Sequence, residues 1–400
     1  MIGRVVVAAA LSNLGDGLRA VALPLLAVTL TRDPVLVSGL VVAAYLPWVV
    51  FGLPIGTLVD RGRPERFMRL ANTGRAMLLA LLVTALATGL VSIWLLYVVA
   101  FLLGIGEALY DNAAQSLVPR VVASNRLESA NGALVTAERV GEDLVGPAVG
   151  GLLFTAATVL PFGLNALLTG LAAGLLLTVR TTASAPTARL TGMVAETVAG
   201  MRWLWKETFL RRLVLTGTAL VFATWLWEST LVLLATNLIG LSPAGYGLAL
   251  AVGALGGVAG AVATPRLVAR MDRWLLQLGS IGICGLFDLL LAAVPSPVTV
   301  ALAWGGTGFG FALWHVISLS TRQRVVPENL LARVNSAART LSITAIPAGA
   351  LAGGLLADAV NLRAPAIVSG VGILLLLLAY AATSRRDRVL LQPAAAESSR

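Results

Sequence analysis

The sequence predicts an all-α integral membrane protein with twelve transmembrane helices in two pseudo-symmetric six-helix bundles. Its 400 residues are 58% hydrophobic and only 12% charged, whereas soluble domains carry roughly 25% charged residues. The apolar residues form long runs, and a helix of about 20 such residues crosses a bilayer core. The second half of the chain also repeats short motifs of the first half.

The predicted spans follow one another with short loops, except in the middle of the chain. A membrane β-barrel would show short alternating segments instead of such long apolar runs. The first span is too long for a signal-peptide core and lacks a small-residue cleavage site, so we expect a retained helix. The expected spans are residues 5–30, 37–59, 68–90, 93–117, 129–156, 159–179, 213–239, 246–268, 274–294, 298–320, 334–360 and 364–383.

The basic residues are distributed unevenly between the two faces that this layout defines. Most of the 29 Lys and Arg residues lie near the termini, in the central stretch or in loops after even-numbered spans, while the other face holds only Arg32 and Arg363. The positive-inside rule then predicts a multi-pass protein of the cell inner (cytoplasmic) membrane with both termini in the cytoplasm. This placement also argues against nucleic-acid binding, despite a net charge of +10.

An internal repeat divides the chain into two related halves. Pro119, Asn131 and Gly150-Gly151 return about half a chain later as Pro327, Asn335 and Gly353-Gly354. Two parallel six-helix halves occur in secondary transporters, with the substrate site near the bilayer midplane. The expected domains are an N-terminal bundle (1–180), a cytoplasmic linker with an amphipathic helix (181–212), a C-terminal bundle (213–384) and a cytoplasmic tail (385–400).

Ionisable side chains inside the spans are candidates for the mechanism, because inserting each one costs about 2.5–3.5 kcal/mol. Asp16 with Arg19, and Arg139 with Asp143, have the spacing of helical ion pairs. Two acidic stripes have no opposite charge on their own helix face; they comprise Glu107, Asp111 and Gln115, and then Glu138 and Glu142.

Burial and neighbouring like charges both favour the protonated form of a carboxyl group, which suits a proton carrier. We therefore expect proton coupling to involve one or more of five acids: Glu107, Asp111, Glu138, Glu142 and Asp16. The alternative is that the two acidic stripes make structural hydrogen bonds with Arg75 or Arg139.

The second half holds fewer candidates. Glu228, Asp288 and His315 are the ionisable residues inside its spans that attract attention, and a lone histidine titrates in a useful range. Four tryptophans offer possible aromatic walls for an amphipathic substrate, although tryptophan is also common at membrane interfaces. They are Trp225, Trp227, Trp304 and Trp314.

Four longer motifs carry a resemblance that covers essentially the whole chain. They are Leu14–Asp16 with Ala22–Leu26, Gly56–Arg61 with Arg63 and Arg66, Gly106–Gln115 with Pro119, and Gly146–Gly151. Together they resemble the major facilitator superfamily, and within it the drug-exporter group that includes macrolide-efflux and siderophore-export proteins. This sequence departs from the pattern where Pro64-Glu65 interrupts the basic run. It also lacks the helix-4 arginine of other drug exporters and has Glu107 nearby instead.

The resemblance implies roles for several of these residues. A gating loop would use Gly56, Asp60, Arg61, Arg63 and Arg66, and an antiporter-like motif would use Gly146, Pro147, Gly150 and Gly151. In the family, the first, fourth, seventh and tenth helices line the cavity. The resemblance therefore favours Asp16, Glu107, Glu228 and His315 as cavity residues. Gln115 and the four tryptophans complete the candidates for the substrate cavity.

Several other kinds of chemistry are excluded by residues that the sequence lacks. A P-loop needs Gly-Lys-Ser/Thr, and the only lysine, Lys206, follows Trp205. One cysteine, Cys284, and one histidine cannot form a thiolate-rich or multi-histidine metal site. No nucleophile-elbow sequence accompanies His315. We therefore expect no enzyme activity, no cofactor and no metal.

The sequence-based hypothesis is a monomeric, proton-coupled exporter of small amphipathic or hydrophobic compounds that works by alternating access. A second hypothesis is a dedicated exporter or flippase of one metabolite, such as a siderophore or a lysolipid. A third is a membrane receptor or non-transporting scaffold, for which the short non-cytoplasmic loops leave little room.

Overall fold

The computed structural model describes residues 2–122, 127–179 and 190–385, and throughout these ranges the regular structure is helical. The chain forms two compact units, and each unit is made of two separate segments of the sequence. The first comprises Met1–Val194 and Leu231–Ala251, and the second comprises Ala195–Thr230 and Val252–Arg400. The domain boundaries expected from the sequence stay a prediction, because 181–189 and 386–400 lie outside the described residues.

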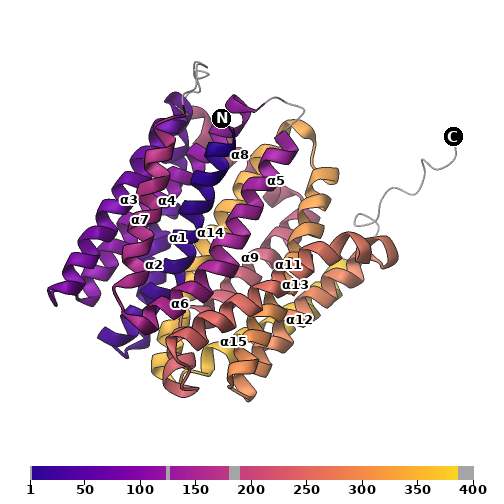
Figure 1. Ribbon diagram of the computed structural model, residues 1–400. Coiled ribbons are helices and arrows are strands. Elements are labelled where there is room, and N and C mark those ends of the chain that lie inside the picture. The colour runs from indigo at the N-terminus through magenta and orange to yellow at the C-terminus, as the bar shows by residue number, and fades with distance from the viewer. Residues whose placement is uncertain (1, 123–126, 180–189, 386–400) are drawn as a thin grey trace. The chain divides into compact units, whose positions relative to one another are not determined.

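The first unit is built around α1, which packs against α7 and against the segment from α5 to α6 (Figure 1). In the same unit α2 packs against α4, and α3 lies between α4 and α7. Its helices are α1 (Ile2–Leu30), α2 (Pro34–Arg61), α3 (Pro64–Ala87), α4 (Ile93–Val121), α5 (Leu127–Glu138), the π-helix η2 (Arg139–Val145), α6 (Gly146–Ala156), α7 (Leu160–Leu176), α10 (Leu231–Leu233) and the π-helix η3 (Leu234–Leu238).

The second unit repeats this pattern: α12 packs against α13 and α15, and α9 packs against α14 and α15. Its helices are α9 (Thr208–Glu228), α12 (Arg273–Ala293), α13 (Pro297–Val325), α14 (Glu328–Ala359) and α15 (Ala364–Ser384). Helix α8 (Leu190–Lys206) leads into it, and α11 (Pro243–Arg270) runs from the first unit's Leu231–Ala251 segment into the second unit.

The described helices account for the twelve predicted spans. Ten candidate spans are long and apolar enough to cross a membrane, and α7 is a shorter apolar helix. The continuous helical segment α5–η2–α6 supplies the remaining span. The predicted fold class is confirmed. The π-helix η2 interrupts an α-helical segment and ends directly before Gly146-Pro147, where proline removes one backbone donor, whereas η3 ends the segment that α10 begins.

The helix predicted in the linker is present as α8, and it packs on the second unit. Leu204 is fully buried in the apolar core of that unit. A Cβ on Gly200 would lie 3.1 Å from the Cβ of Arg333 at the start of α14. Trp205 is 48% exposed, so the described residues leave this aromatic side chain of α8 partly uncovered.

The sequence repeat corresponds to one repeated helix contact. A Cβ on Gly150 of α6 would lie 2.9 Å from the carbonyl oxygen of Leu18 on α1. The matching Gly353 of α14 meets the carbonyl oxygen of Leu226 on α9. Glycine is required in both places because the backbones approach too closely for any side chain. The repeat is therefore one of three-dimensional structure as well as of sequence.

Candidate functional site

A buried network of charged side chains joins three helices of the first unit. Asp16 on α1 forms an ion pair with Arg75 on α3. Nη2 of Arg19, one turn further along α1, lies 3.3 Å from Oδ1 of Asp16 and 2.5 Å from Oε2 of Glu107 on α4. The exposed side-chain fractions are 7% for Asp16, 1% for Arg75, 11% for Arg19 and 27% for Glu107. Charged groups this buried require partners, and here each has one.

Two neutral side chains hold Arg75 in place from the other side. Its Nη1 donates to Oγ of Ser12 at 3.2 Å and to Oδ1 of Asn72 at 3.4 Å. The Ser12 hydroxyl also donates to Oδ1 of Asn72 at 3.3 Å. Ser12 and Asn72 are themselves fully buried. The guanidinium of Arg75 is thereby fixed between α1 and α3.

The network is electrically balanced, with two guanidinium groups facing two carboxylates. The predicted Asp16–Arg19 pair is present, and so is the predicted Arg139–Asp143 pair, with Nη1 and Oδ2 2.8 Å apart. Glu107 has no opposite charge on its own helix, as the sequence indicates, but Arg19 of α1 supplies one. Spacing along a single helix could not reveal this contact between α1 and α4.

Glycines on both sides of Asp16 let two other segments approach α1. A Cβ on Gly15 would collide with the side chain of Asn165 on α7. A Cβ on Gly17 would lie 2.6 Å from the carbonyl oxygen of Gly141 in η2. On the same side, Gly146 contacts the backbone of Gly17. The antiporter-like motif therefore packs directly against the helix that carries Asp16.

The rest of this motif contacts other parts of the first unit. Pro147 is buried beside Gly146. A Cβ on Gly151 would lie 3.1 Å from the Cα of Gly247 at the start of α11. The small residues of the motif therefore allow neighbouring helices to pack closely against it.

The remaining acidic candidates of the first unit lie around the network and are less enclosed. Asp111 of α4 and Glu142 of η2 are partly buried, and both have Glu107 and Asp16 among their electrostatic neighbours. Glu138 and Gln115 are exposed. Only Asp16 and Glu107, of the five predicted acids, take part in the ion-pair network.

The predicted gating loop connects α2 with α3. Gly56 is buried, while Arg63 and Arg66 are exposed. The side chains of Asp60 and Arg61 lie outside the described part. Arg120, at the end of α4, donates from Nη1 to the carbonyl oxygen of Gly62 at 3.3 Å, a contact that the motif alone did not indicate.

Among the described acidic residues of the second unit, Asp288 of α12 is the most enclosed, since it is fully buried. Its Oδ1 accepts a hydrogen bond from the Thr307 hydroxyl of α13 at 3.0 Å, and its Oδ2 accepts one from the Ser369 hydroxyl of α15 at 2.6 Å. Glu228 of α9 is partly buried and is an electrostatic neighbour of Asp288. The sequence marks Asp288 only as an ionisable residue inside a span, because its hydrogen-bond donors come from distant segments.

The aromatic candidates divide into different environments. Trp227 is 2% exposed and meets Trp304 edge to face, with ring centroids 6.0 Å apart. Trp314 packs in the core of the second unit, with its centroid 5.4 Å from that of Tyr380. Trp225 is partly buried.

The histidine candidate, His315, is exposed, and its ring stacks on Phe311 with centroids 6.2 Å apart. It lies on α13, one residue beyond the buried Trp314.

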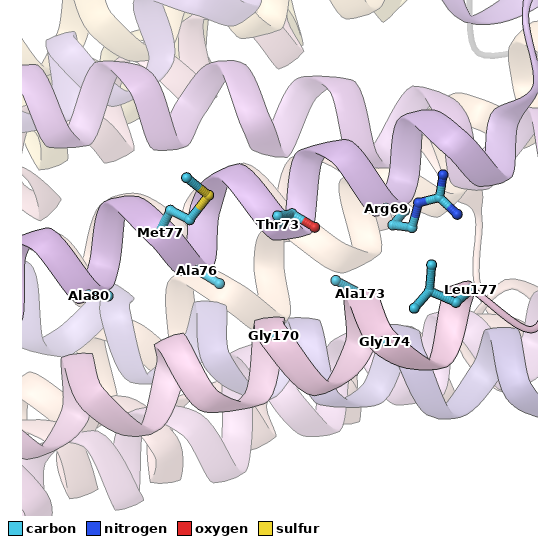
Figure 2. A pocket seen from close by; sticks show the side chains of 9 residues that line it. All are labelled: Arg69, Thr73, Ala76, Met77, Ala80, Gly170, Ala173, Gly174 and Leu177. Atoms are coloured by element: carbon cyan, nitrogen blue, oxygen red, sulfur yellow. The ribbon is translucent and has the colours of Figure 1, made fainter.

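A groove of about 380 Å³ lies between α3 and α7 of the first unit. Figure 2 shows Arg69 and Leu177 at one end of it and Met77 and Ala80 towards the other. Its remaining lining residues are Thr73, Ala76, Gly170, Ala173 and Gly174. This lining holds none of the acidic candidates, so the groove is separate from the charged network.

The sequence profile of the Major Facilitator Superfamily matches residues 5–346. The chain belongs to this superfamily of membrane transporters. It is 26% identical over 402 residues to the uncharacterized MFS-type transporter YfiS of Bacillus subtilis (strain 168), covering 94% of this chain and 92% of that protein. It is thus a transporter rather than an enzyme.

Solved structures share its fold at low sequence identity. A bacterial homologue of the iron transporter ferroportin, in an inward-facing state, has a TM-score of 0.76 at 17% identity, covering 96% of this chain and 98% of that one. A point mutant of the nucleoside transporter NupG has a TM-score of 0.75 at 14% identity, covering 95% of this chain and 99% of that one. Because these named cargoes differ and the identities are low, the likeness concerns the fold alone.

Proposed function

We propose that this transporter is a proton-coupled exporter of small amphipathic or hydrophobic compounds. The observation that carries the proposal is the buried network of Asp16, Arg19, Arg75 and Glu107 across α1, α3 and α4. Intramembrane ionisable groups are costly to bury and commonly mark proton relays or substrate pathways in transporters. A network of two carboxylates and two guanidinium groups can change its ion pairing when one carboxylate gains a proton.

The pairing gives protonation a mechanical consequence. When Glu107 takes up a proton, its attraction for Arg19 is lost, and Arg19 is left to pair with Asp16 alone. The link between α1 and α4 is then weakened while the link between α1 and α3 remains. Deprotonation restores the first link, so proton binding and release bias two arrangements of these helices.

The proposed cargo follows from the resemblance to drug exporters and from Trp304, whose partly buried ring packs against the buried ring of Trp227. Aromatic faces suit amphipathic molecules, especially cationic ones. We also propose that the protein lies in the cell inner membrane with both termini in the cytoplasm, because the basic residues gather in the loops of one face. The proposed working unit is a monomer.

Everted membrane vesicles with an imposed pH gradient test the coupling, with the cationic dye ethidium as probe. Glu107→Gln should lower gradient-driven ethidium transport at least tenfold, because the amide cannot exchange the proton. The matched control is Asp143→Asn, which removes a carboxylate from a more exposed pair. Gradient-dependent transport of undiminished rate in Glu107→Gln would exclude this residue from coupling.

A substrate panel tests the proposed cargo class separately. Erythromycin and a lysophospholipid, added to the same vesicles, should compete with ethidium if the cargo class is broad. Competition by a single compound would instead support a dedicated exporter or flippase.

A further inference from the structure

The environment of Asp288 differs in kind from that of the acids in the first unit. Both of its carboxyl oxygens accept hydroxyl hydrogen bonds, from Thr307 of α13 and Ser369 of α15. The Nε1–H of Trp227 on α9 lies next to the same carboxyl group and completes no hydrogen bond with a described residue. Donors from three helices therefore surround Asp288, which is fully buried on a fourth.

No cation compensates this carboxyl group among the described residues. The groups that face it are Glu228 and Trp227 from α9, Thr307 from α13, Ser369 from α15 and Cys284 from its own helix. Cys284 is itself buried and directs its thiol to the carbonyl oxygen of Thr307 at 3.6 Å. The one charged neighbour, Glu228, is also an acid. The first unit's network, in contrast, balances each carboxylate with a guanidinium.

A permanently charged Asp288 would be expensive in this position. A carboxylate inside a membrane-spanning helix is costly without a compensating cation, and Glu228 adds repulsion when it too is charged. A proton removes both penalties. The three surrounding donors also make the charged form attainable for a limited time, because hydrogen bonds to a carboxylate are stronger than those between neutral groups.

We propose that Asp288 is a second proton-binding site of this transporter, separate from the Asp16–Glu107 network. The proposal builds on the transport function proposed above but does not depend on Glu107. Proton uptake forms an O–H bond on one carboxyl oxygen, and the hydroxyl that donated to this oxygen turns to accept from it. Proton release reverses this turn and leaves three donors for the carboxylate.

Asp288 is linked through Trp227 to Trp304, the aromatic residue proposed above to contact substrate. Trp227 lies between Asp288 and Trp304, whose ring it meets at an interplanar angle of 90°. When Asp288 is charged, the Trp227 N–H gains an acceptor and its ring is held towards α12. When Asp288 is protonated, this hold is weaker, so the aromatic pair can respond to proton binding. Glu228, the next residue on α9, is partly exposed and can pass protons inwards.

Infrared difference spectroscopy of the purified full-length protein tests the proposal without any substrate. A pH titration should show a protonated-carboxyl C=O band that Asp288→Asn removes, with an amplitude of one carboxyl group. Ser369→Ala should keep this band but move it to higher frequency, because the 2.6 Å hydrogen bond is lost. The control Asp358→Asn, an exposed residue of α14, should leave the band unchanged.

Two results would overturn the proposal. One is an Asp288→Asn spectrum that matches the wild type across the titration. The other is a band that responds to sodium chloride but not to potassium chloride at fixed pH, which would assign the site to Na⁺. If Asp288→Asn does not fold, Ser369→Ala and Thr307→Val test the proposal instead. A carboxyl band at the wild-type frequency in both variants would exclude Asp288 as the proton-binding group. Glu107→Gln removes only the contribution of Glu107 to the spectrum and should leave the Asp288 band in place, so the two proposals fail separately.

Discussion

Removing Arg75 should destabilise the first unit strongly, because it leaves two carboxylates to share Arg19. In Arg75→Leu, Asp16 keeps only the Arg19 contact at 3.3 Å, and Ser12 and Asn72 lose a charged donor. Breaking a buried ion pair by deleting one partner costs about 3–5 kcal/mol. For a bundle of roughly 150–250 residues, each kcal/mol lowers the Tm by about 2–4 °C. We therefore expect the Tm to fall by about 6–20 °C.

Thermal unfolding of the detergent-purified protein, followed by tryptophan fluorescence, measures this loss. The double variant Asp16→Asn/Arg75→Leu should recover much of it, because Glu107 and Arg19 then remain as a balanced pair. Arg139→Leu is the control: its side chain is 61% exposed, and such pairs contribute at most about 1 kcal/mol. If the losses of Asp16→Asn and Arg75→Leu add within about 0.5 kcal/mol, the two residues are not coupled and the reasoning fails.

Three further variants test other parts of the structure. Gly150→Ala should lower the free energy of unfolding by about 1–3 kcal/mol in the same assay, because its Cβ would lie 2.9 Å from the carbonyl oxygen of Leu18. Gly163→Ala is the control, since nothing lies within 4 Å of a Cβ on Gly163. Equal Tm values for the two variants would contradict the contact. Trp304→Ala should raise the KM for ethidium about three- to tenfold, as expected for an aromatic contact of about 0.5–1.5 kcal/mol. The control is Trp94→Ala, since Trp94 is 64% exposed. An unchanged KM in Trp304→Ala would exclude Trp304 from substrate binding. Gly170→Val, which narrows the groove in Figure 2, should leave ethidium transport within about twofold of wild type, and a larger loss would make the groove part of the pathway.

The sequence predicts the fold well because each of its signals is local. Apolar runs and breakers define helices one at a time, and Pro119 and Pro327 reveal the repeat without any knowledge of contacts. The Asp16–Arg19 pair is also local, since its members lie one turn apart on α1. Such features follow from helix geometry alone.

The site is predicted less completely because its contacts join distant segments. Glu107 looks uncompensated in the sequence, and only the approach of α1 to α4 gives it Arg19. The sequence suggests Arg75 only as a structural hydrogen-bond partner of the acidic stripes, yet it connects α1 with α3. Asp288 shows the reverse case: its hydroxyl donors, Thr307 and Ser369, carry no signal in a sequence rich in small polar residues.

The two units therefore handle buried acids in different ways. Sequence reasoning places the coupling chemistry in the first half, where the motifs and acidic stripes lie. The structure adds a candidate in the second half. Asp16 and Glu107 are balanced by arginines, whereas Asp288 has no such partner among the described residues. We infer that proton chemistry involves both halves of the repeat.

Simultaneous recording of dye and proton movement tests the central claim most directly. Purified protein is reconstituted into liposomes that contain a pH-sensitive dye, and ethidium is added without an imposed gradient. Our account predicts that ethidium movement drives protons in the opposite direction, and that Glu107→Gln abolishes the proton signal. Ethidium movement at the wild-type rate with no accompanying proton flux would contradict it.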